Sequence, residues 1–295
     1  MRARYLAGRT GQAALVLWAA FTVAYLLLQA LPGDSILIKF QNPELGLSPE
    51  QIAEIRRFYD AGGYLHTLLG FLRGDFGYSV ETGTPVIERL AEGLPETAKL
   101  AGPAFLLALV LAVVIAFSAR GFLRALPPLF VSVPVFWLGI VLIQVFSFQL
   151  KLVPVIGGTP AQQLLLPVVT LAIPIAAPIA QVLGRSIDQT LRQPFIQVVA
   201  AKGASRRWIL HRHVARNALL PTLTIAGLTF GELIAGSVVT ETVFGRNGIG
   251  RLTEQSVNAQ DTPVLLAIVV LATCVFVLVN LVVDLLYPVL DPRLA

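Results

Sequence analysis

The stretch QVVAAKGASRRWILHRHVARNALLPTLT, residues 197–224, interrupts an otherwise apolar chain with a dense run of positive charge. Seven basic side chains, counting His211 and His213, fall between Lys202 and Arg216. Long uncharged runs precede and follow this stretch. Such a charge cluster either docks a polar partner or fixes the orientation of the chain in a membrane.

The composition places the chain in a lipid bilayer. Hydrophobic residues make up 56% of the 295 positions and charged residues only 13%, whereas soluble domains have about 25% charged residues. The net charge of +5 is explained by membrane topology, so no nucleic acid partner is expected. The single cysteine, Cys274, provides neither a disulfide framework nor a Cys/His metal cluster, and no metal site is expected.

Six segments are long and apolar enough to cross a bilayer, which requires about 20 residues. The first follows Arg9 and is longer than a signal-peptide core of about 7 to 15 residues, so we expect a retained span. The sequence predicts an all-α membrane protein with six transmembrane helices at about 10–31, 98–118, 126–148, 165–187, 217–240 and 263–285.

The charges are distributed unequally between the two sides that these six spans define. The side with both termini, the loop near residue 120 and the stretch 188–216 carries thirteen Lys and Arg against three acids. The opposite side carries nine Lys and Arg and thirteen acids. Because basic residues are retained in the cytoplasm during insertion, both termini are predicted to be cytoplasmic.

The long outer segment is predicted to contain local structure. SPEQIAEIRRFYD, residues 48–60, has Ser48 and Gln51 in the positions of a capping box and should form a short helix. A second short helix is expected at 85–94, and GDFGYSV, residues 74–80, indicates a turn-rich strand or loop. The chain therefore divides into an N-terminal span (1–31), an extracytoplasmic segment (32–97) and a core of five spans (98–295) with the loop at about 188–216.

Polar and helix-breaking residues inside the spans are candidates for the path of a transported solute. Pro134 lies in the third span, and Pro174 and Pro178 lie in the fourth. These prolines favour kinks, which serve either bundle packing or a pathway. Glu232 is the one ionisable residue deep in a predicted span, where a charge costs about 2.5 to 3.5 kcal/mol. It either faces a cavity, where it could meet a cationic solute group, or forms a structural hydrogen bond.

The basic stretch itself predicts a helical elbow. Pro194 suits the first position of a helix and Gly203 the position after its end, with Phe195, Val198 and Val199 on one apolar face. Ser205 then caps a second, basic helix. Small residues at the bend allow another protein to approach the backbone closely.

This stretch resembles the cytoplasmic EAA loop of bacterial ABC importer permeases, in the version of the dipeptide, oligopeptide and nickel branch. The resemblance implies the type I ABC importer permease fold. The matching phrases, in chain order, are LLQALPGD (27–34), LPETAKLA (94–101), SVPVFWLG (132–139), LPVVTLAIP (166–174), VVTETVFGRNGIGRL (238–252) and LVNLVVDLLYPVLDPRL (278–294).

In that family the loop forms a coupling helix that inserts into a cleft of the cytoplasmic ATPase. The leading acid of the family's motif is absent here, where Gln197 stands, and Ala200 replaces a residue that is often basic in this branch. A basic loop that serves only orientation is the alternative. The residues to which the resemblance assigns ATPase coupling are Val199, Ala200, Ala201, Lys202, Gly203, Ala204, Arg206 and Arg207.

The resemblance also implies the partners: a second homologous permease, two cytoplasmic ATPase subunits and an extracytoplasmic solute-binding protein, assembled in the bacterial inner membrane. The chain has no phosphate-binding loop of the G-x4-G-K-[ST] type. ATP and Mg are therefore expected on the partner subunits, with no cofactor on this non-enzymatic chain. The expected substrate is a short peptide, with nickel, a metal chelate, glutathione or a sugar oligomer as alternatives. Other classes left open are an ion-gradient-driven carrier that uses Glu232 and a scaffold or receptor without transport.

Overall fold

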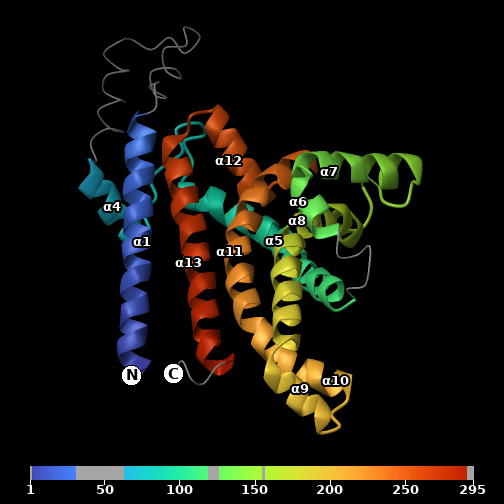
Figure 1. The fold of residues 1–295 in the computed structure, drawn as a ribbon. Helices are drawn as coiled ribbons and strands as arrows, with labels where there is room; N and C mark the ends of the chain where they lie inside the picture. The colour runs from blue at the N-terminus through green and yellow to red at the C-terminus, as the bar shows by residue number, and fades with distance from the viewer. Residues whose placement is uncertain (1, 31–62, 119–125, 155–156, 291–295) are drawn as a thin grey trace, which may run out of the picture. The chain divides into compact units, whose positions relative to one another are not determined.

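The computed structural model describes residues 2–30, 63–118, 126–154 and 157–290, and these residues are almost entirely helical (Figure 1). In these ranges the β-pairing is one isolated bridge between Tyr78 and Pro85. The helices in chain order are α1 (Arg2–Ala30), α4 (Tyr64–Leu72), α5 (Val86–Phe117), α6 (Leu126–Ser132), α7 (Val135–Leu142), the π-helix η3 (Ile143–Gln149), α8 (Pro160–Leu191), α9 (Pro194–Ala201), α10 (Arg206–Ile209), the π-helix η4 (Leu210–Val214), α11 (Ala215–Val243), α12 (Ile249–Asn258) and α13 (Thr262–Leu290).

Five helical stretches of the described chain are long and apolar enough to cross a membrane, and they match five of the six predicted spans. They are Gly8–Ala30, Val86–Phe117, Pro160–Leu191, Arg206–Val243 and Thr262–Tyr287.

The predicted third span, 126–148, is not one continuous helix. α6 ends at Ser132, and Pro134 is the N-cap of α7 with extended backbone angles, φ −60° and ψ 135°. The cause is local, because a proline has no N–H to donate and disfavours helical geometry at the residue before it. The remainder, Val135–Gln149, is an apolar helix shorter than the five long ones.

The outer segment differs from its prediction in one respect. The short helix expected at 85–94 is the first part of α5, which continues without a break to Phe117. The prediction that residues 74–80 are rich in turns is confirmed by the positive φ angles of Gly74 and Gly77. The short helix predicted within residues 48–60 lies outside the described residues.

The described residues form two compact units. One comprises Arg2 and the described residues within 97–246 and 278–295, and the other those within 3–96 and 247–277. Each unit has its own buried apolar core. In the first unit α8 contacts α6, α7 and α11. In the second unit Val86 and Leu90 of α5 share a buried cluster with residues of α12 and α13.

Small residues bring the helices of the first unit close together. Ala104, Ala108 and Ala112 of α5 are fully buried and belong to one cluster with α8 and α11. Their spacing of four residues places them on one face of α5. Alanine at such positions allows close helix packing, which stabilises helix association in a bilayer. Thirteen of the 32 residues of α8 are buried, all between Leu166 and Ile187, and this packed part supports the elements at its ends.

Candidate functional site

The basic stretch forms the helical elbow that the sequence predicts. α9 begins at Pro194, and the chain turns after Ala201 through Gly203, whose φ of +84° is the left-handed geometry that glycine adopts freely. The Gly203 N–H donates to the Ala200 carbonyl at 3.0 Å. The Ser205 side chain accepts from the backbone N–H of Trp208 and so caps α10.

Apolar side chains attach this elbow to the long helices. Ile196 of α9 and Ile209 of α10 are buried, and Val214 of η4 is fully buried. They form one cluster with Leu183 and Ile187 of α8. The elbow is therefore fixed to α8 by packed apolar side chains.

The buried residue of α9 lies outside the apolar face of Phe195, Val198 and Val199 that the sequence predicts. Ile196 is the buried residue, whereas Phe195 and Val198 are 40% and 55% exposed. Trp208 of α10 is also half exposed, at 49%. The His213 ring lies 4.9 Å from the Trp208 ring and 6.1 Å from the Phe195 ring, measured between centroids. The elbow therefore has a surface patch of aromatic and aliphatic side chains. This patch was not predicted from the sequence, because basic residues dominate the composition of the stretch.

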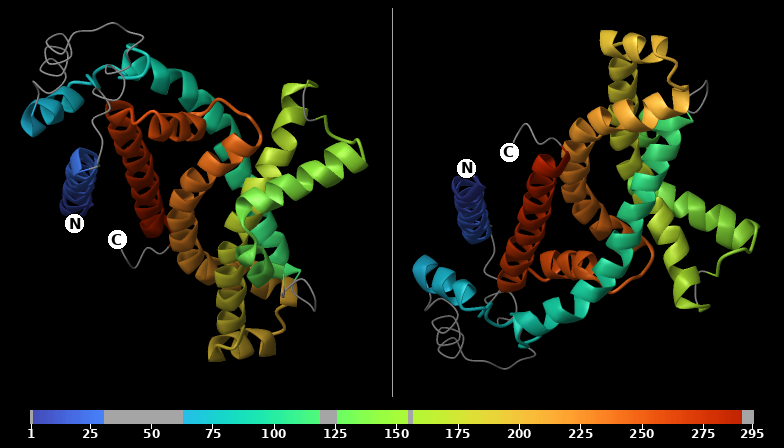
Figure 2. Two further views of the ribbon diagram at one scale, coloured as in Figure 1. Left: turned by 90° about the horizontal axis from the view of Figure 1, so that it is seen from above. Right: turned by 90° about the horizontal axis from the view of Figure 1, so that it is seen from below.

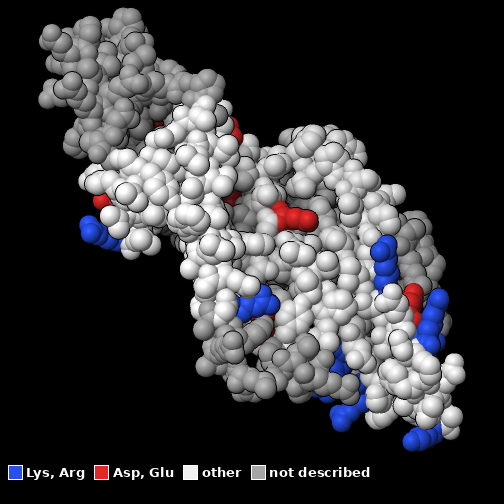
Figure 3. Space-filling model, turned by 60° about the vertical axis from the view of Figure 1, so that its left-hand side comes forward, with Lys and Arg blue, Asp and Glu red and all other residues white. Residues whose placement is uncertain are grey.

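Most of the predicted coupling residues share this outer surface. Figures 1 and 2 show α9 and α10 at one end of α8, away from α6 and α7. Figure 3 shows Lys and Arg side chains at the end of the molecule where α9 and α10 lie. Val199 and Ala204 are partly buried, and the exposed predicted residues are Ala200, Ala201, Lys202, Gly203, Arg206 and Arg207.

Glu232 lies on an uncovered face of α11. Positions three or four residues apart share a helix face. The carboxylate of Glu232 is thus exposed on a helix that is apolar enough to cross a membrane, and exposure to lipid would be costly. This face must be covered by another protein or must line an aqueous cavity. We call this face the α11 stripe; its exposed residues are Asn217, Pro221, Thr224, Leu228, Glu232, Ala235, Val239 and Thr242.

The predicted path prolines occupy other elements of the same unit. Pro174 and Pro178 are partly buried inside α8, which remains helical through both. Pro134 is exposed at the start of α7. The structure thus distributes the four path candidates over three helices, with Glu232 on the exposed α11 stripe.

A second carboxylate of α11 was missed because the predicted span ended at residue 240. Glu241 is fully buried, and it accepts a hydrogen bond from the Thr97 hydroxyl at 2.7 Å. α11 extends to Val243, so this residue belongs to the helix and not to an outer loop. The bond fixes the end of α11 to α5, which is a structural role.

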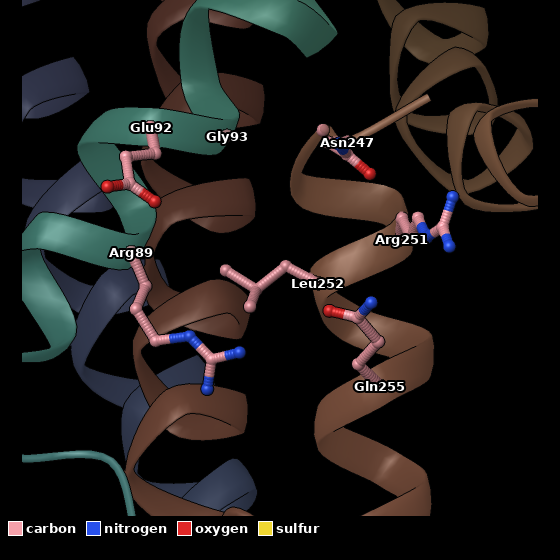
Figure 4. Close-up of a pocket in the computed structure, with 8 residues that line it drawn as sticks. Arg89, Glu92, Gly93, Asn247, Arg251, Leu252 and Gln255 are labelled. Atoms are coloured by element: carbon pink, nitrogen blue, oxygen red, sulfur yellow. The ribbon is translucent and has the colours of Figure 1, made fainter. Parts of the chain in front are cut away.

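The second unit contains a polar cavity of about 280 Å³ between the start of α5 and α12 (Figure 4). One wall holds an ionic network in which the Arg89 guanidinium lies 3.3 Å from a Glu81 oxygen and 3.6 Å from an Asp261 oxygen. Asp261 is fully buried and also accepts hydrogen bonds from the Ser79 hydroxyl and the Val80 N–H. This network ties the 74–85 turn to the start of α13. The residues that line the cavity are Arg89, Glu92, Gly93, Asn247, Gly248, Arg251, Leu252 and Gln255.

Neither unit shows the arrangement of a metal centre. Within the described ranges, no three His, Cys, Asp or Glu side chains are grouped so that they could hold a metal ion. The features that remain for function are the exposed elbow and the α11 stripe, both in the first unit.

Comparison with known proteins identifies relatives over most of the chain. Residues 104–295 match the family described as "Binding-protein-dependent transport system inner membrane component". The "Probable peptide ABC transporter permease protein y4tP" of Sinorhizobium fredii is 36% identical over 291 residues, which cover 92% of each chain. The "Glutathione transport system permease protein GsiC" of Escherichia coli K12 is 32% identical over 285 residues, again 92% of each chain.

Solved structures share the fold. The inward-facing MetNI methionine ABC transporter superposes with a TM-score of 0.57 at 19% identity, over 70% of this chain and 97% of that chain. An amino acid ABC transporter crystallised with histidines gives a TM-score of 0.53 at 17% identity, over 68% of this chain and 92% of that chain. At these identities the likeness concerns the helical architecture alone.

Proposed function

Because the chain belongs to the binding-protein-dependent transport system inner membrane component family, we propose that it forms half of the membrane path by which an ATP-driven importer takes up short peptides. It is a permease subunit of an ABC importer and a multi-pass inner-membrane protein. A peptide substrate is supported by the peptide permease among its relatives, and glutathione in another relative is itself a short peptide. Nickel, a metal chelate or another small solute are the alternatives.

The single observation that carries the mechanism is the exposed elbow on a buried support. The apolar patch of Phe195, Val198 and Trp208 with its basic surround suits a protein partner, because interface centres are apolar and their rims polar. Two cytoplasmic ATPase subunits would bind it and its counterpart on a second permease. ATP and Mg would be held by those subunits, so this chain carries out no catalysis.

The α11 stripe gives the other half of the proposal. Movement of α9 and α10 passes through the buried cluster around Ile196 and Val214 to α8 and α11. The stripe, with Glu232 near its middle, would face the second permease across the path. Rocking of the two permeases would open this path alternately to the solute-binding protein outside and to the cytoplasm.

Cross-linking of the complete complex tests the coupling surface. In a Cys274→Ser background, Val198→Cys should be cross-linked to the ATPase by a short maleimide–succinimidyl ester reagent, which joins this thiol to a lysine amine of the ATPase, because Val198 is 55% exposed. Ile196→Cys, two residues away on the same helix and 7% exposed, is the matched control and should not react. Equal cross-linking of both variants, or of neither, would contradict the assignment.

Transport assays test the energy source. Uptake of a peptide into proteoliposomes that contain the complex should require ATP inside and should be inhibited by vanadate. The family membership decides against the ion-gradient-driven carrier, which would instead lose uptake when an uncoupler is added.

A further inference from the structure

Helix α4, Tyr64–Leu72, has two apolar faces, of which its own unit covers only one. Tyr64, Leu68 and Phe71 pack in a cluster with Phe21 and other residues of α1. The other face is formed by leucines at i, i+4 and i+7, which lie above one another on a helix. These are Leu65, Leu69 and Leu72, with exposed fractions of 69%, 50% and 75%.

α4 contacts α1 within the apolar stretch of α1 that is long enough to cross a membrane. Its partners on α1 lie between Phe21 and Leu28, which is about 3 to 14 Å before the end of α1 at Ala30. The apolar helix Gly8–Ala30 has 23 residues, enough to cross a hydrocarbon layer of about 30 Å. α4 therefore lies at the level of the outermost hydrocarbon, on the side of the bilayer where α1 ends.

Helix α4 packs against α1 and is inclined to it (Figures 1 and 2). The rings of Tyr64 and Phe71 lie 5.7 and 5.2 Å from the same ring, that of Phe21. These two residues are seven positions apart, or about 10 Å along a helix. These contacts hold α4 against α1, and because α4 is inclined to α1 it lies nearer to the membrane plane than α1 does.

The polar residues of α4 occupy the remaining side. With 3.6 residues per turn, His66 and Arg73 project about a quarter turn from the leucine face, and Thr67 projects further round. His66 and Arg73 are both exposed. A helix with one apolar face, a polar face and Tyr or Trp at its edge is typical of the membrane interface.

We propose that α4 is an interfacial helix whose Leu65, Leu69 and Leu72 insert among the lipid acyl chains next to the end of α1. Lipid is the occupant that this depth favours, because at the same level α1 exposes apolar side chains on the face opposite its contacts with α4. There Val23, Leu26 and Leu27 are 56%, 58% and 64% exposed on a membrane span. Through the Tyr64 and Phe71 contacts, this insertion would fix the depth of the outer end of α1.

Spin labels at single positions test the proposal in the full-length protein reconstituted in lipid nanodiscs. In a Cys274→Ser background, a nitroxide is placed at Leu69 or Leu72, and at His66 as the matched control on the same helix. Collision rates with oxygen, which concentrates in the acyl chains, and with a water-soluble nickel chelate are then measured. The ratio should favour oxygen at both leucines and the nickel chelate at His66.

Two results would overturn the proposal, and both are distinguishable from a failure to fold. Preference for the nickel chelate at Leu69 and Leu72 would place this face in water. Exclusion of both reagents, with an immobilised spectrum, would mean that another part of the chain or a partner subunit covers it. A label at Leu68 should be immobilised in every case, because this residue packs against α1, and so it reports that the helix is folded.

Discussion

Among single residues of the described chain, Asp261 is one of two fully buried carboxylates, the other being Glu241. The Asp261 carboxylate lies 3.6 Å from the Arg89 guanidinium and 3.2 Å from the Val80 nitrogen. Asp261→Asn would remove the negative charge that compensates Arg89. It would also place an amide N–H donor of the asparagine where the surrounding groups are themselves hydrogen-bond donors. We expect it to lower the free energy of unfolding by about 3 to 5 kcal/mol, measured by thermal unfolding in detergent.

The control for this substitution is the other anionic partner of Arg89. The Glu81 side chain is 42% exposed, and exposed ion pairs contribute about 0 to 1 kcal/mol. Glu81→Gln should therefore change the stability little. Equal losses in the two variants would show that burial does not govern this network.

A substitution of Glu232 tests whether the α11 stripe lines the path of the substrate. If its carboxylate meets a cationic group of the substrate in the path, Glu232→Gln removes a charged hydrogen bond of about 1.5 to 3 kcal/mol. The rate of peptide uptake should then fall by about tenfold or more, with normal assembly and ATPase binding. Ala235→Ser, at the next exposed position of the stripe, should leave uptake near wild type. Undiminished uptake by Glu232→Gln would remove this residue from the path.

At the scale of elements, the α9–α10 turn depends on the conformation of one glycine. Gly203 has φ +84°, and an added Cβ would meet open space, so Gly203→Ala tests backbone strain alone. The strain of a left-handed residue costs about 1 to 2 kcal/mol. We expect weaker binding of the ATPase subunits by Gly203→Ala, measured by copurification. Gly203→Asn is the control, because asparagine tolerates this geometry, and it should lose less binding. Identical losses would contradict the conformational explanation.

The helices show which features a sequence can predict and which it cannot. Pro194, Gly203 and Ser205 predicted the start, the turn and the cap of the elbow correctly, because these signals act within a few residues. The burial of Ile196 was not predicted. Ile196 faces inward because α8 supplies its partners, and tertiary contacts of that kind are not encoded in local periodicity. The π-helices η3 and η4 likewise have no local signal.

The long apolar helices were predictable because span length and composition follow from the thickness of the bilayer. The site was predictable only in part. The sequence located the elbow and Glu232, but it missed the exposed Trp208 and the buried Glu241. In both cases the exposure of the side chain is decided by neighbouring helices, which no single segment specifies.

At the scale of the whole molecule, the charge asymmetry and the helices can be combined to predict sidedness. Both termini on the cytoplasmic side require an even number of crossings, whereas five helices of the described chain are long enough to cross alone. The sixth crossing must then be the broken segment α6–α7–η3. From Leu126 to Gln149 it has 24 residues, about 36 Å if helical throughout, which suffices despite the break at Pro134.

Cysteine labelling on either side of this segment decides the question. In a Cys274→Ser background, Ser118→Cys precedes the segment and Ala161→Cys follows it, and both positions are exposed. A membrane-impermeant maleimide added to intact spheroplasts should label Ala161→Cys, and should label Ser118→Cys only after permeabilisation. If both are labelled from the same side, α6–α7–η3 is re-entrant. The elbow and the N-terminus would then lie on opposite sides, and since the elbow must be cytoplasmic to bind an ATPase, the N-terminal arginines would be outside, against the charge rule.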